Sequence, residues 1–222
     1  MFKRRIILNI VVEGGSALLR QSSFALKNGK RKLVFAEECV SAMESNDRSR
    51  RLAHYALKIA DALDLDYEQR ENIRLLCYCY DLGKIFDDYQ REDVIYFSQQ
   101  AELENKHTEI GAAIAQCLPQ LYGISEAIRY HHEKWDGSGL YGLQGEQIPL
   151  SCRVFSVCWA YDKMIRPGGG RVGMILSDAL TELEQFAGRE LDPSLISLFQ
   201  GLLNEKPKGA LHVKPKMAFS FR

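Results

Sequence analysis

Apolar residues recur every three or four positions along most of the chain, which is the spacing of one buried helical face. The clearest stripe runs from Leu52 to Leu63, and Asn46 or Asp47 precedes it as a candidate N-cap. No alternation of strand and helix patterns indicates a parallel sheet. We therefore expect an all-α bundle over residues 35–205, with further helices near 71–80, 110–118, 124–132, 149–164, 173–187 and 193–203.

The two ends of the chain differ from this pattern. In residues 1–34 the stretch Ile6–Val12 is rich in β-branched residues and predicts a strand, and Lys27-Asn28-Gly29-Lys30 is a turn signal. We treat this region as an N-terminal extension that contains a candidate β-strand. Residues 206–222 carry five basic residues and no acidic residue, which predicts a solvated basic tail.

Composition narrows the class of protein. A chain of 222 residues suits one domain with a small extension, and 46% hydrophobic and 26% charged residues are ordinary for a globular protein. The 29 basic and 29 acidic residues balance, so nothing indicates DNA binding. No apolar run approaches the roughly 20 residues of a membrane span. The six cysteines form no Cys-x-x-Cys pair, which favours reduced thiols and a cytoplasmic location.

Four residues carry candidate metal chemistry: Asp81, His107, His131 and His132. Neutral imidazoles and a carboxylate suit zinc, iron, manganese or nickel. His131 and His132 lie at a predicted helix end, and His107 is expected to open its helix, so the rings can converge. Any one histidine is more often a core or surface residue than a ligand. Because three of the five histidines follow this pattern, we favour a metal site.

The order of motifs between about residues 36 and 203 resembles the HD-GYP family, the bacterial branch of the HD metal-dependent phosphohydrolases. The matching segments are Arg48-Ser49-Arg50-Arg51-Leu52-Ala53, Tyr80-Asp81-Leu82-Gly83-Lys84-Ile85, His107-Thr108-Glu109-Ile110-Gly111, the run of residues 131–139 (His-His-Glu-Lys-Trp-Asp-Gly-Ser-Gly), residues 142–149 and Arg153.

The resemblance implies hydrolysis of cyclic-di-GMP at a site of two or three metals. Asp81 would then be a bridging carboxylate, the three histidines would ligate one metal, and Lys84 would lie near the phosphate with Asp81 as a catalytic pair. The loop that would contact the substrate contains Asp136, Gly137 and Gly139 and is followed by Arg153.

Three positions depart from the family pattern. Arg48 stands where the first ligand histidine is expected, Tyr80 where the histidine of the His-Asp doublet is expected, and Trp159 where the last ligand aspartate is expected. A guanidinium and an indole offer no lone pair to a cation. All three losses affect one metal. The Gly-Tyr-Pro element is also altered, since Gly139-Leu140-Tyr141 is followed directly by Gly142.

We interpret the chain as a degenerate HD-GYP-like domain, a pseudoenzyme that has lost two-metal hydrolysis and serves in signal transduction as a binding module. The alternative is an active phosphohydrolase that uses one metal. The cofactor is therefore one divalent transition metal (Fe, Mn, Zn or Ni) or none, and the candidate partners are a protein, a second copy of the chain or a cyclic dinucleotide. We also expect Arg48 to pair with Asp81 and replace the lost cation.

Overall fold

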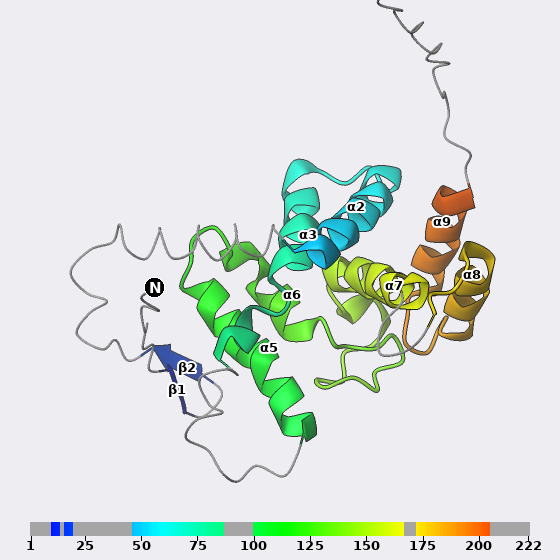
Figure 1. Ribbon diagram of the computed structural model, residues 1–222. Coiled ribbons are helices and arrows are strands. Elements are labelled where there is room, and N and C mark those ends of the chain that lie inside the picture. Colours follow the sequence, from blue (N-terminus) through cyan, green and yellow to red (C-terminus); the bar gives the residue numbers. More distant parts are fainter. Residues whose placement is uncertain (1–9, 14–15, 20–45, 87–99, 167–171, 205–222) are drawn as a thin grey trace, which may run out of the picture.

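The computed structural model describes residues 10–13, 16–19, 46–86, 100–166 and 172–204. Apart from one short hairpin, the described elements are helices packed into a bundle (Figure 1), which confirms the predicted all-α fold. In chain order they are α2 Asp47–Ala62, α3 Tyr67–Cys79, the 3-10 helix η1 Leu82–Phe86, α5 Gln100–Gln116, η2 Tyr122–Ile124, α6 Ser125–Tyr130, η3 Gly145–Gln147, α7 Leu150–Ile165, α8 Leu176–Gln185 and α9 Pro193–Asn204.

The first two helices begin at side-chain caps. The Asn46 side chain accepts the backbone N–H of Arg48 at 2.9 Å, as the sequence predicts. Helix α3 begins four residues before the expected start because Asp66 and Gln69 form a capping box, in which each side chain accepts the other's backbone N–H. Its first turn is polar, so apolar periodicity alone places the start too late.

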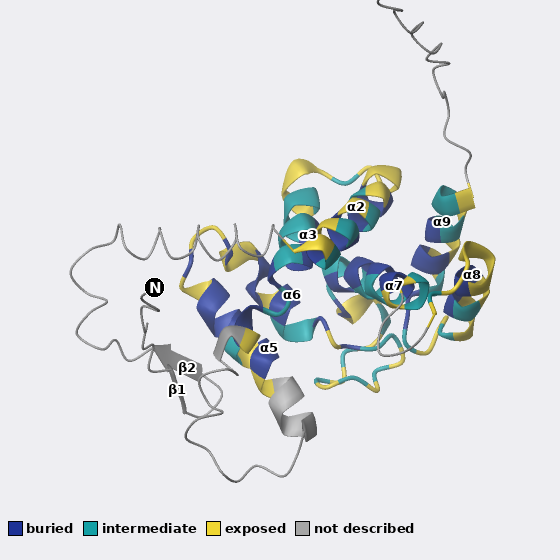
Figure 2. Ribbon diagram, viewed as in Figure 1, coloured by how far each residue is buried: buried dark blue, intermediate teal, exposed yellow. Residues whose placement is uncertain are grey.

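Helix α7 lies at the centre of the core and packs against α2, α3, α6, α8 and α9. Figure 2 shows buried and intermediate residues interspersed along it. Cys152 and Cys158 are fully buried there and pack as predicted, and the cysteines in the described part of the chain are free thiols. The same helix carries Trp159 and Asp162, so the core helix also reaches the candidate site.

Two glycines bring η1 against α5. A Cβ atom on Gly83 would lie 2.0 Å from the carbonyl oxygen of His107, and one on Gly111 would lie 2.9 Å from a methyl group of Ile128. These distances leave no room for a side chain, so glycine is required for the close approach of the two backbones. The contact fixes the segment that carries Asp81 next to the helix that carries His107.

The described part of the N-terminal extension is a two-stranded antiparallel hairpin. Strand β1 Ile10–Glu13 pairs with β2 Ser16–Leu19, with Ile10 opposite Leu19. Its first strand overlaps the strand predicted over residues 6–12. The turn predicted at residues 27–30 and the basic tail 206–222 lie outside the described residues. Within the described part, no helix has the length and apolar character needed to cross a bilayer.

Candidate metal centre

Three imidazole rings converge at the contact between α5 and the end of α6. The Nε2 atom of His107 lies 3.4 Å from Nε2 of His131 and 3.3 Å from Nε2 of His132. Nitrogen ligands held about 2.1 Å from one ion in tetrahedral geometry are about 3.4 Å apart. One ligand atom from each histidine lies within 4.8 Å of the other two. The donor set and its spacing therefore fit a single transition-metal ion.

The backbone fixes the orientation of the His131 ring. Its Nδ1 lies 2.7 Å from the carbonyl oxygen of Ile128. Because a carbonyl only accepts, Nδ1 carries the proton and donates, which leaves the lone pair of Nε2 directed at the cluster. Burial, with help from His132, holds the pKa of His131 well below its usual value. The ring is therefore neutral, which is the state that binds a metal.

His107 reaches the cluster from the interior of its helix. Helix α5 begins at Gln100, so the expectation that His107 opens the helix is wrong. The preceding residues, Ala101–Lys106, are good helix formers without an apolar stripe, so periodicity did not reveal them. The ring points inward because it shares a buried face with Gly111 and Ile114, and its side chain is only 1% exposed. The expected helix end at His131, in contrast, is confirmed.

Asp81 lies at the edge of the histidine rings. Its Oδ1 is 3.8 Å from Nε2 of His107 and 2.8 Å from Nζ of Lys84, which belongs to η1. Both side chains are partly exposed, so the pair lies at the boundary between the buried histidine rings and solvent. We call Asp81, His107, His131 and His132 the histidine cluster. Its carboxylate and three imidazoles are the groups that would hold a metal ion.

Arg48 does not pair with Asp81, so this expectation was wrong. Its Nε lies 3.4 Å from Oδ2 of Asp162, a buried carboxylate on α7. Arg51 binds the same carboxylate in a bidentate way, with Nε at 2.6 Å from Oδ1 and Nη2 at 3.1 Å from Oδ2. Sequence reasoning did not single out Asp162, because its partners are about a hundred positions away in the chain.

Two of the three substituted positions contact each other. The Arg48 guanidinium carbon lies 5.7 Å from the centre of the Trp159 ring, and Nζ of Lys163 lies 4.8 Å from it. Both distances are those of cation–π contacts. We call Arg48, Arg51, Trp159, Asp162 and Lys163 the arginine–tryptophan cluster. It contains side chains that fill space and carry positive charge where the family resemblance implies ligands of a first metal.

Tyr80, the third substituted position, packs against His131 of the histidine cluster and against Phe155, which lies one turn before Trp159 on α7. Its ring lies 5.8 Å from that of His131 and 4.8 Å from that of Phe155. Burial raises the pKa of Tyr80 to about 12, and the nearby carboxylate of Asp81 adds to the effect while Arg48 opposes it. The phenol is therefore neutral near pH 7 and is a poor ligand for a cation.

The loop after the histidines is held by a carboxylate that sequence reasoning missed. Glu133 is buried and accepts the backbone N–H groups of Tyr141 and Leu143, both at 2.7 Å. A Cβ atom on Gly139 would lie 2.8 Å from Cα of Glu133, so the loop closes tightly over this residue. The signal was available in the sequence as an acidic residue between His132 and a glycine-rich stretch.

The other predicted loop residues have structural contacts. Asp136 accepts the backbone N–H of Ser138 at 2.9 Å, and Gly137 has a φ of +81°, which favours glycine. Arg153 donates to Asp192 at 2.9 Å and to the carbonyl of Ile148 at 3.0 Å, and its guanidinium lies 5.8 Å from the Trp135 ring. Arg153 thus ties the loop to Asp192 and to the backbone of Ile148.

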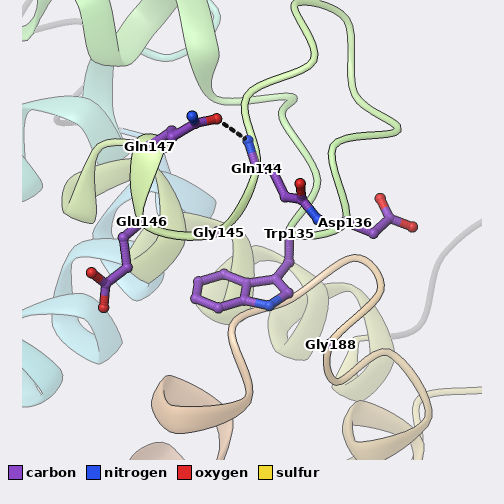
Figure 3. Close-up of a pocket in the computed structure, with 7 residues that line it drawn as sticks. All are labelled: Trp135, Asp136, Gln144, Gly145, Glu146, Gln147 and Gly188. Carbon is purple, nitrogen blue, oxygen red and sulfur yellow. Dashed lines mark hydrogen bonds between the residues drawn. The ribbon is translucent and has the colours of Figure 1, made fainter.

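A hollow opens on the outer side of this loop (Figure 3). The Trp135 ring lies at its centre, with the carboxylates of Asp136 and Glu146 directed to opposite sides. The remaining lining residues are Gln144, Gly145, Gln147 and Gly188. The histidine cluster does not contribute to this lining, so the hollow and the candidate metal centre are separate features.

Comparisons with known proteins agree with this fold. The chain is 27% identical over 168 residues to a cyclic di-GMP phosphodiesterase of Thermotoga maritima, covering 73% of this chain and 46% of the relative. It is 26% identical over 183 residues to the 3'3'-cGAMP-specific phosphodiesterase 2 of Vibrio cholerae, covering 78% and 35%. The crystal structure of a cyclic GMP-AMP specific phosphodiesterase of V. cholerae, V-cGAP3, superposes with a TM-score of 0.57 at 16% identity and covers 78% of this chain and 48% of that one.

The chain therefore spans less than half the length of these relatives. The family described as HD domain matches residues 37–195, which lie within the helical domain predicted over 35–205. The match covers well over half of the chain and includes both clusters. The motifs, the helical bundle and the relatives agree, and the protein belongs to the HD domain family.

Proposed function

We propose that this protein is a degenerate HD domain that holds one transition-metal ion at the histidine cluster and has lost two-metal hydrolysis. In this proposal it acts as a signalling module that binds a cyclic dinucleotide without cleaving it. The relatives named as cyclic di-GMP and 3'3'-cGAMP phosphodiesterases support this class of ligand.

One observation carries the proposal. The three positions that the resemblance assigns to one metal hold an arginine, a neutral tyrosine and a tryptophan, and two of these contact each other. Hydrolysis by two metals needs an ion on each side of the attacked phosphorus. The arginine–tryptophan cluster leaves no lone pairs there for a cation other than those of Asp162, whose oxygens are both within reach of Arg51.

The remaining residues support binding. A metal at the histidine cluster would supply Lewis-acid character and a positive charge for a phosphate oxygen. Lys84 would add a point charge beside it, held near the opening by Asp81. His131 would stay neutral because of its burial and its hydrogen bond to Ile128.

The second candidate function is a phosphohydrolase with one metal. The spacing of 3.3–3.4 Å between the imidazole nitrogens favours it, because such a site also occurs in hydrolytic enzymes with three protein ligands. Asp81 would then accept a proton, and Lys84 would neutralise developing charge. This reading requires measurable turnover of a cyclic dinucleotide.

The test combines metal content with turnover. Elemental analysis of the purified protein is expected to give about one transition-metal ion per chain, and His131→Ala should lower this to near zero. His54→Ala is the matched control, because His54 is exposed on α2 and lies outside the cluster. Metal content of His54→Ala should equal that of the parent protein.

Turnover separates the two functions. Incubation of the metal-loaded protein with cyclic di-GMP is expected to leave the dinucleotide intact while binding is detected by calorimetry. Cleavage that is abolished by Asp81→Asn would support the hydrolase instead. Both candidate functions would be contradicted if the purified protein contained no metal and substitutions in the histidine cluster had no effect.

A further inference from the structure

The arginine–tryptophan cluster has more positive charge than its own carboxylate balances. Arg51 uses its Nε and Nη2 on the two oxygens of Asp162, at 2.6 and 3.1 Å. Arg48 reaches Asp162 only through Nε, at 3.4 Å, and Lys163 is held by the Trp159 ring. Two guanidinium groups thus share one carboxylate, and the Lys163 ammonium lies over the neighbouring Trp159 ring. The cluster therefore contains three cations and one carboxylate, an excess of two positive charges that equals the charge of one divalent ion.

Of the two arginines that bind Asp162, Arg48 is the more accessible to a ligand, and Lys163 on α7 is exposed beside the same Trp159 ring. The Arg48 side chain is 40% exposed, compared with 27% for Arg51 and 1% for Asp162. Among the residues that the structure describes, its Nη atoms make no hydrogen bond, whereas its Nε faces Asp162 and its carbon lies over Trp159. The guanidinium is therefore oriented by two contacts while one edge remains available.

The position of Arg48 is unfavourable for a cation on its own. It lies in the first turn of α2, where the helix dipole is positive. The shared Asp162 carboxylate offsets this only in part, and Asp47, the acidic residue of the same turn, is paired with Arg50. A bound anion would relieve the repulsion, and it would meet both the guanidinium and the N-terminal end of a 16-residue helix.

We propose that the arginine–tryptophan cluster is an anion site that binds a phosphate group of the cyclic dinucleotide without a metal, with Arg48 as the contacting residue. The planar guanidinium offers parallel N–H groups that match two phosphate oxygens, and stacking on Trp159 keeps the plane fixed. This proposal rests on the proposed function, which it deepens by assigning the charge of the lost metal to residues of the chain itself.

The neighbouring cluster explains why a second phosphate contact is expected nearby. The Tyr80 ring contacts His131 on one hand and Phe155 on the other, and Phe155 lies one helical turn before Trp159 on α7. A cyclic dinucleotide has two phosphodiester groups. One would meet Lys84 and the histidine cluster, and the other would meet Arg48.

The experiment measures binding to metal-free protein. The full chain is dialysed against a chelator, and calorimetry is performed with cyclic di-GMP, inorganic phosphate and guanosine as separate probes. Arg48→Gln is expected to weaken cyclic di-GMP binding about tenfold or more, the loss of one charge-assisted hydrogen bond. Arg48→Lys, which keeps the charge, should lose less than Arg48→Gln. Arg50→Gln is the matched control, because Arg50 is exposed on the same helix and pairs with Asp47.

Each outcome is decisive. Equal affinity of Arg48→Gln and the parent protein, or an equal loss in Arg50→Gln, would overturn the anion site. Binding of guanosine as tight as that of cyclic di-GMP would also overturn it, because guanosine has no phosphate. Binding of inorganic phosphate that depends on Arg48 would show that the phosphate alone supplies the contact.

The result is separable from the proposed function. If the metal-free protein binds no probe while the metal-loaded protein binds cyclic di-GMP without cleaving it, the anion site fails and the proposed function stands. If the metal-loaded protein cleaves cyclic di-GMP and the metal-free protein still binds it through Arg48, the proposed function fails and the anion site stands.

Discussion

The histidine cluster and the arginine–tryptophan cluster are built in opposite ways. The first gathers neutral nitrogens and one partly exposed carboxylate, which together attract a cation. The second places two guanidinium groups on a buried carboxylate and a third cation, Lys163, over the Trp159 ring, and this excess of positive charge attracts an anion. In the proposed function, the difference teaches how a metal site can be lost without destabilising the fold, because an arginine and a tryptophan would replace the ion in charge and in volume.

The largest effect that separates the two clusters is expected at Gly83, which shapes the histidine cluster and not the arginine–tryptophan cluster. Gly83→Ala places a methyl group 2.0 Å from the His107 carbonyl, so η1 must move away from α5. We expect a loss of at least about 3 kcal/mol in the free energy of unfolding, the range of severe steric clashes. Urea denaturation measures this loss. The metal content should fall as well, because Asp81 moves with η1.

Gly201→Ala is the control for this change. No atom lies within 4 Å of a Cβ built on Gly201, which lies in α9. Alanine should therefore stabilise the protein by about 0.5 kcal/mol, since glycine is a poor helix former. A Gly83→Ala protein as stable as the parent would mean that the contact between η1 and α5 is loose.

Asp162 organises only the arginine–tryptophan cluster. Asp162→Asn removes the charge that Arg51 and Arg48 share, while the shape is kept. We expect a loss of about 2 kcal/mol, less than for a fully buried pair because Arg51 is partly exposed. Metal content should not change. In Asp47→Asn, which breaks an exposed pair with Arg50, the loss should stay below about 1 kcal/mol.

The pattern of the two results matters more than either value. Gly83→Ala is expected to affect stability and metal content together, and Asp162→Asn is expected to affect stability alone. A drop in metal content in Asp162→Asn would show that Asp162 belongs to the metal centre, and the division into two clusters would then be wrong.

The smallest expected effect is the titration of the Tyr80 phenol, which packs against His131. Its pKa is raised to about 12 by burial, from an ordinary value of 10.0. The stabilisation from the neutral phenol is therefore complete below pH 10 and is lost as the pH rises through 12. The difference in tyrosinate absorbance between the metal-free parent protein and Tyr80→Phe should titrate near pH 12. A midpoint below 9 would indicate a phenolate stabilised by a cation.

Local signals in the sequence predicted much of this structure. The apolar stripes located most helices, and the two candidates for the first cap, Asn46 and Asp47, included the residue that caps α2, Asn46. The convergence of His107, His131 and His132 also followed from the motifs. Helix starts in polar segments, such as Gln100 and Tyr67, could not be located by apolar periodicity.

Pairings between residues far apart in the chain could not be predicted from the sequence. Asp162 lies 111 positions from Arg51, and many acidic residues were equally available as partners for Arg48. The choice depends on how α7 crosses α2, which is set by packing of the whole core. The role of Glu133 was missed for a related reason. Its carboxylate oxygens accept backbone N–H groups of a loop, and no local sequence pattern defines the path of that loop.

The central claim is that one metal site is kept and the other has been replaced by charged and aromatic side chains. The most direct test compares metal stoichiometry in the parent protein and in the triple variant Arg48→His, Tyr80→His and Trp159→Asp, both loaded with Mn²⁺ and passed through a desalting column. We predict one ion per chain in the parent protein and two in the variant. Two ions in the parent protein, or none in it, would contradict the account.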